Sequence, residues 1–93
     1  MKILGYDYQI NRTNTLDELG VFGRHNPTAQ LIQIANNLAP QQAESTLLHE
    51  VIEAINYAMD LGFNEHTMRV LEASLYQVLT DNGITLKSFR DMQ

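Results

Sequence analysis

Four side chains in the C-terminal half of the chain could together bind a metal ion and move a proton. His49 and Glu53 are four residues apart in an amphipathic segment. On a helix they would lie on successive turns, about 6 Å apart along the axis. Glu50 directly follows His49, where a general base could take a proton from a metal-bound water. The spacing therefore predicts a metal site with a base beside it.

Glu72 is the fourth of these side chains. It falls near the centre of an apolar helical arc, which comprises Met68, Leu71, Leu75, Tyr76, Val78 and Leu79. A carboxylate facing the core must be paired, metal-bound or protonated, because burying an unpaired charge is costly. If the chain reverses near Gly62, Glu72 lies level with position 52, between His49 and Glu53. We therefore expect His49, Glu53 and Glu72 as metal ligands and Glu50 as the base.

Two helices must position these side chains. Pro40 suits the first turn of a helix and Gly62 suits a helix end, which predicts a helix from about residue 40 to about residue 60. Asn64 is a suitable N-cap for a second helix that runs to about Asp81. The two helices would form an antiparallel αα-hairpin.

The N-terminal half has the composition of a small sheet. Residues 2–10 alternate partly between apolar and polar side chains, and residues 29–35 are short and rich in β-branched residues. We expect two strands here, the second antiparallel to the first. Residues 11–28 contain turn-forming Asn, Gly and Pro, and the tail from residue 84 to 93 would fold back as a strap or short helix. The predicted fold is α+β, with a short antiparallel sheet of two to three strands packed on the helical hairpin.

Length and composition narrow the class of protein. The chain, residues 1–93, suits a single domain, and its 44% hydrophobic and 18% charged residues are typical of a folded globule. A net charge of -5 and scattered basic residues argue against a nucleic-acid partner. The chain has no cysteine, which excludes disulfides, thiolate ligands and cysteine nucleophiles. Without a signal-like start or an apolar run of about 20 residues, we expect a cytoplasmic protein with no membrane segment.

The segments 47–55 and 71–79 resemble the two active-site helices of the zincin metallopeptidases. More narrowly, they are similar to the minimal zincin-like proteins of bacteria and their phages, in which a strand pair precedes a His-Glu-x-x-His helix. Residues 23–27 and 32–34 also resemble these proteins. In gluzincins a Glu of the following helix is the third ligand, as Glu72 would be. The resemblance implies a metal-dependent peptidase, but Glu53 stands where that family has its second histidine.

This substitution gives one imidazole and two carboxylates, His49, Glu53 and Glu72. Imidazole suits zinc, whereas additional carboxylates favour harder ions such as Mn²⁺ or Mg²⁺. Carboxylate oxygens are nevertheless ordinary zinc ligands. We therefore expect zinc or another divalent ion as cofactor, held by a set that makes it a weaker Lewis acid. Peptidase turnover should be reduced accordingly.

Several other residues receive a first interpretation from sequence. Tyr57 is a candidate for substrate binding beside Glu53, and so are Ile32 and Ile34, because the strand 29–35 could be the edge along which an extended peptide lies. An open sheet edge also suggests a homodimer. His25 is interpreted as a turn residue. The first-turn residues of the second helix are interpreted as surface groups near the helix dipole; they are Glu65 and His66.

Two other functions remain as alternatives. The first is a non-catalytic, degenerate zincin that binds a protein partner through its polar helix face or sheet edge, with Glu72 bonded to His49 without a metal. The second takes Glu50 and Glu53 as the Glu-x-x-Glu motif of all-α nucleotide pyrophosphohydrolases, which bind Mg²⁺. Those enzymes need a second acidic pair, and Leu75 follows Glu72 at that spacing. The predicted strands also disagree with an all-α fold.

Overall fold

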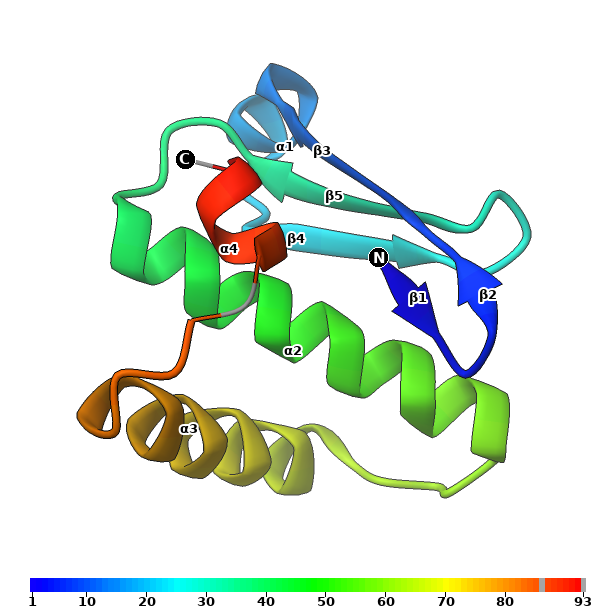
Figure 1. Ribbon diagram of the computed structural model, residues 1–93. Helices are drawn as coiled ribbons and strands as arrows, with labels where there is room; N and C mark the ends of the chain where they lie inside the picture. Colours follow the sequence, from blue (N-terminus) through cyan, green and yellow to red (C-terminus); the bar gives the residue numbers. More distant parts are fainter. Residues whose placement is uncertain (86, 93) are drawn as a thin grey trace.

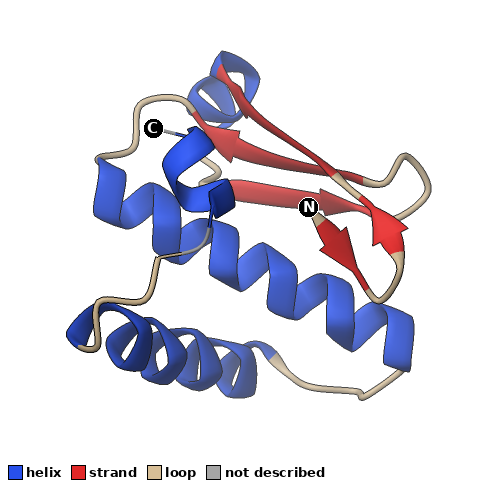
Figure 2. Ribbon diagram, in the orientation of Figure 1, coloured by secondary structure: helices blue, strands red, loops and turns tan. Residues whose placement is uncertain are grey.

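The computed structural model describes residues 1–85 and 87–92 of the chain. Helix α2 lies between a three-stranded sheet and helix α3 (Figures 1 and 2). The predicted α+β class and the C-terminal pair of long helices are confirmed. The elements follow in the order β1 (Lys2–Ile3), β2 (Tyr6–Asp7), β3 (Gln9–Thr13), α1 (Asn14–Leu19), β4 (Gly23–Asn26), β5 (Leu31–Ala35), α2 (Pro40–Met59), α3 (Glu65–Asp81) and α4 (Lys87–Met92).

The three-stranded sheet has the order β3–β5–β4. Strand β5 pairs in parallel with β3 and antiparallel with β4. The expectation that segment 29–35 is antiparallel to the first strand was therefore wrong. The reason is that α1 and β4 lie between β3 and β5 in the chain, so β5 reverses relative to β4 and runs with β3. Segment 29–35 is also the centre of the sheet and not its edge.

The predicted single strand 2–10 is interrupted by a hairpin. Leu4 and Gly5 both have positive φ angles, of 50° and 85°. Two such residues form the tight turn that suits a two-residue hairpin, and they join β1 to β2. The chain then starts a new strand at Gln9. A turn at Gly5 outweighs the apolar alternation on either side of it.

The boundaries of α2 and α3 agree with those predicted, although α2 ends for a different reason from the one expected. Asp60 at the end of α2 has φ 51°, and its N–H bonds to the carbonyls of Asn56 and Tyr57. Gly62 lies two residues further on in the connection. The side chain of Asn64 accepts a hydrogen bond of 2.8 Å from the N–H of Thr67 at the start of α3.

The core lies mainly between α2 and the sheet. Ile32 and Ile34 of β5 are completely buried against the apolar face of α2, so they cannot line a substrate site as expected. Phe89 of α4 is also buried in this core, which confirms that the tail folds back. None of the helices in the described part of the chain has the length and apolar character that a membrane span requires.

Helix α3 is less buried than its apolar arc predicted. It packs against α2, on the side away from the sheet (Figure 1). Met68 is buried, but Leu75 and Val78 are exposed. A single neighbouring helix covers only a narrow stripe of α3. Glu72 therefore faces α2 and not a closed core.

Arg12 joins β3 to the connection between β5 and α2. Its Nε donates a hydrogen bond to the carbonyl of Ala35 at 3.1 Å. Its Nη2 donates to the carbonyls of Asn36 and Leu38 at 3.0 and 3.1 Å. One guanidinium thus binds the carbonyl of the last residue of β5 and two carbonyls that follow it, and it fixes the connection that leads from the sheet to α2.

We predict that Arg12→Met lowers the free energy of unfolding by about 1.5–3 kcal/mol, the range for hydrogen bonds to charged groups. Urea unfolding followed by circular dichroism measures it. Arg24→Met is the matched control, because Arg24 lies exposed on β4. Equal stability of the two variants would contradict the structural role of Arg12.

Candidate metal centre

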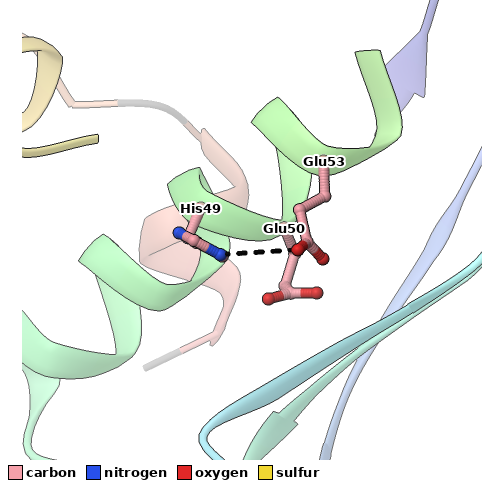
Figure 3. Close-up of side chains that lie close together, drawn as sticks. All are labelled: His49, Glu50 and Glu53. Atoms are coloured by element: carbon pink, nitrogen blue, oxygen red, sulfur yellow. Dashed lines mark ion pairs between the residues drawn. The ribbon is translucent and has the colours of Figure 1, made fainter. Parts of the chain in front are cut away.

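One turn of α2 brings together the side chains of His49, Glu50 and Glu53. Each offers one ligand atom, and these atoms all lie within 4.8 Å of one another. The carboxyl groups of Glu50 and Glu53 lie next to each other, and a dashed line joins Glu53 to the His49 ring (Figure 3). This group could hold a divalent ion, as expected for the site, although the predicted ligands were His49, Glu53 and Glu72 with Glu50 as the base.

The two ring nitrogens of His49 have different neighbours. Nδ1 lies 2.9 Å from Oε1 of Glu72. An ionised carboxylate only accepts hydrogen bonds, so Nδ1 carries the proton and donates it to Glu72. Nε2 then faces Oε1 of Glu53 at 3.6 Å and Oε2 of Glu65 at 3.8 Å. The nitrogen available to an ion is therefore the one that points at these two carboxylates.

Glu72 and His49 are in contact as expected, but Glu72 has a different role from the one predicted. A contact of 2.9 Å is a hydrogen bond, with no room for an ion between the two atoms. Glu72 thus orients the imidazole from behind and does not share an ion with it. This corrects the predicted ligand set of His49, Glu53 and Glu72. A carboxylate that holds the second nitrogen is the usual support of a metal-binding histidine.

Glu65 was expected at the surface, and it is 59% exposed, yet its carboxylate reaches His49. The signal that could have found it is its spacing from Glu72. Residues seven apart lie on the same face of a helix, two turns from each other. If Glu72 points toward α2, Glu65 must do so as well.

Glu50 is buried to 4% exposure against β4. A Cβ atom at Gly23 would lie 2.7 Å from Cγ2 of Thr46 and 3.0 Å from Cγ of Glu50. Only glycine permits this close approach of strand and helix. Thr46 and Glu50 are both buried because β4 covers this face of α2. The turn-forming composition of residues 11–28 did not predict β4 as a strand.

Burial is the largest of the causes that together raise the pKa of Glu50 to about 8. The negative charge of Glu53 and a hydrogen bond between these two carboxyl groups are the next causes, and the charges of Glu65 and Glu72 add smaller contributions. Protonated Glu50 therefore donates to Glu53. A carboxyl group with a pKa in this range is suited to exchange protons near neutral pH.

The donor set fits a divalent ion. Two atoms each about 2.1 Å from a tetrahedral ion lie about 3.4 Å apart. The distances from Nε2 of His49 to Glu53 and Glu65 are 3.6 and 3.8 Å, close to this value. Carboxylates converging on a ring nitrogen repel one another unless a proton or a cation lies between them. A cation would also remove the repulsion that raises the pKa of Glu50.

A cleft of about 490 Å³ borders the centre. It lies between the start of β4, the middle of α2 and the first turns of α3. Its lining includes His49, Glu50 and Glu65, together with Phe22 and Arg69. The centre can therefore be reached by a small molecule or by part of an extended chain.

The structure places Tyr57 and His25 differently from the sequence interpretation. Tyr57 is 67% exposed and lies edge-on to the ring of His25, with centroids 5.9 Å apart. His25 is part of β4 and not of a turn, and its Nε2 lies 3.1 Å from the hydroxyl of Tyr8. Burial lowers the pKa of His25, and the nearby Glu53 charge partly opposes this effect.

Asn56, on the same face as Tyr57, binds the backbone of Phe63 and thus holds the α2–α3 connection.

We predict that the protein in a chelator loses stability as the pH rises from 4.5 to about 8, the interval between the ordinary and the folded pKa of Glu50. In this interval the unfolded state binds fewer protons than the folded state, so stability falls with pH. The neutral variant Glu50→Gln should lack this loss and exceed the wild type at pH 8 by on the order of 1–3 kcal/mol.

The measurement is urea unfolding at a series of pH values, with Glu18→Gln, an exposed change on α1, as the control. The control should follow the wild-type curve. Parallel curves for Glu50→Gln and the wild type would show that Glu50 is ionised in the folded protein throughout the interval.

No protein-family model matches the chain, and no curated protein or solved structure matches it. What can be said of the site therefore comes from its own residues and their arrangement. These establish a group of one imidazole and two carboxylates able to hold a divalent metal ion.

Proposed function

We propose that this protein is a zincin-like, metal-dependent peptidase with an atypical histidine–carboxylate ligand set. One observation supports it above the others: His49, Glu50 and Glu53 converge on one turn of α2 while Glu72 holds the opposite side of the imidazole. An isolated surface pair of His49 and Glu53 would need no carboxylate behind the ring. A supported imidazole is what a metal ligand requires.

Each residue has a role in this proposal. His49 binds the ion through Nε2, and Glu53 binds it through a carboxylate oxygen. Glu65 completes the set from α3, since it faces the same nitrogen. The ion would supply Lewis acidity and an acidified water. With an ion bound, its positive charge would favour the ionised form of Glu50. The Glu50 carboxylate could then take the proton from the attacking water and deliver it to the leaving amine.

The sheet provides a place for a peptide substrate. Strand β4 is an edge of the three-stranded sheet, and it replaces segment 29–35 as the candidate edge. Its first residue, Gly23, touches Glu50, and Phe22 lines the same cleft. An extended peptide that added to β4 by main-chain hydrogen bonds would pass beside the ion. The carboxylate-rich set suits Mn²⁺ as well as Zn²⁺.

We predict that chelator-treated protein takes up one Zn²⁺ or Mn²⁺ per chain. His49→Ala and Glu53→Gln should abolish measurable uptake, and Glu72→Gln should weaken it about 10- to 100-fold, as expected for a group that orients a ligand. Isothermal titration calorimetry and elemental analysis measure the affinity and the stoichiometry. Glu18→Gln removes the same charge on α1 and should bind like the wild type. Unchanged affinity in His49→Ala would remove the basis for the site.

We also predict that the metal-loaded protein cleaves a quenched fluorescent peptide library. Glu50→Gln should lower kcat/KM by about 10²–10⁴-fold, the usual contribution of a general base, with full metal content. A metal-loaded wild type that cleaves nothing would instead favour the non-catalytic interaction module. In that case the bond between His49 and Glu72 serves only to keep α2 and α3 in register.

A further inference from the structure

A second cleft, of about 470 Å³, lies at the C-terminal end of α2 and is lined by tyrosines. Three of the four tyrosines of the chain line it: two lie two residues apart, in β2 and just before β3, and the third lies near the C-terminal end of α2. We call it the tyrosine cleft. Its lining residues are Tyr6, Tyr8, Pro27, Thr28, Gln30, Tyr57 and Ala58.

His25 holds this arrangement in place. Its Nε2 lies 3.1 Å from the hydroxyl of Tyr8, and its ring centroid is 5.6 Å from that of Tyr8 and 5.9 Å from that of Tyr57. Tyr8 is buried, whereas Tyr6 and Tyr57 are 55% and 67% exposed. One tyrosine therefore forms the floor of the cleft, and the other two present accessible aromatic surface.

Strand β4 connects the tyrosine cleft to the metal centre. Gly23 and His25 are two residues apart, so they face the same side of the strand, about 6.6 Å from each other. Gly23 touches Glu50, and the charge of Glu53 acts on His25. A peptide lying along β4 with its reactive bond at the metal centre would therefore place a nearby side chain at the tyrosine cleft.

The charge and chemistry of the cleft favour a cation. No Lys or Arg is among the described residues that line it. Aromatic faces attract cations through the ring quadrupole, and a guanidinium can also stack flat on a ring. The side chains of Thr28 and Gln30 offer oxygen acceptors for its N–H groups. The chain as a whole carries a net charge of -5, which attracts the same ligand.

We propose that the tyrosine cleft is a specificity site that binds the guanidinium of an arginine side chain in the peptide substrate. The inference rests on the proposed function in one respect, since it takes the arginine to belong to the substrate. Binding of the guanidinium itself depends on the tyrosines and on no metal. It can therefore be tested on chelator-treated protein.

The experiment titrates chelator-treated protein with N-acetyl-arginine amide and follows the Tyr and His ring resonances by NMR. The expected result is a shift of the Tyr57, Tyr8 and His25 signals. N-acetyl-citrulline amide has the same shape without the charge and should bind at least about 3-fold more weakly. N-acetyl-phenylalanine amide should also bind more weakly, which separates cation recognition from ring stacking.

Substitutions of Tyr57 test whether the arginine probe binds in the tyrosine cleft. Tyr57→Leu keeps an apolar side chain but removes the ring, and it should weaken the arginine probe about 2- to 5-fold. Tyr57→Phe keeps the ring and should bind like the wild type. Both changes lie at an exposed position, so the fold does not depend on them. Tyr76→Phe, on α3 next to Glu44, is the control and should have no effect.

The proposal is overturned if citrulline or phenylalanine amide binds as tightly as arginine amide, if the arginine probe shifts none of these three signals, or if Tyr57→Leu leaves its affinity unchanged. Because no metal is present, these outcomes do not depend on the metal centre. Conversely, a protein that binds arginine amide but no metal would retain the tyrosine cleft and lose the proposed peptidase activity.

Discussion

The hydrogen bond between Nδ1 of His49 and Oε1 of Glu72 is the interaction on which the arrangement of the site depends. It joins α3 to α2, and it fixes which nitrogen of the imidazole is free. With Nδ1 occupied, Nε2 can only face the side on which Glu53 and Glu65 lie. One contact therefore holds α2 and α3 in register and points Nε2 of His49 toward Glu53 and Glu65.

The second constraint is the close approach of β4 to α2. Glycine at position 23 allows the strand to cover Glu50. Glu50 is therefore more deeply buried than its neighbours on the same turn. Glu53 and His49 stay partly accessible and can act as ligands. Glu50 has a raised pKa and is suited to hold a proton. Carboxyl groups one helical turn apart thus acquire different roles from the strand that covers only one of them.

Strand β4 also connects an acidic group of side chains at its start with an aromatic group two residues further along. At its start lies the carboxylate-rich centre around Glu50, where the repulsion between acidic groups favours a cation. Two residues further, His25 connects that centre to the rings of Tyr8 and Tyr57. In the proposed function, an edge strand with the candidate metal centre at one end and an aromatic cleft at the other would offer an extended peptide two points of contact.

The sequence by itself determined the local features: the bounds of α2 and α3, the Asn64 cap and the pairing of His49 with Glu72. Helix caps and helical periodicity act between residues close in the chain, so a single segment contains their signal. Tertiary structure decided that β5 is central and parallel to β3 and that Gly23 covers Glu50. These contacts join segments far apart in the chain, and their geometry depends on strand pairing and packing that no local pattern encodes.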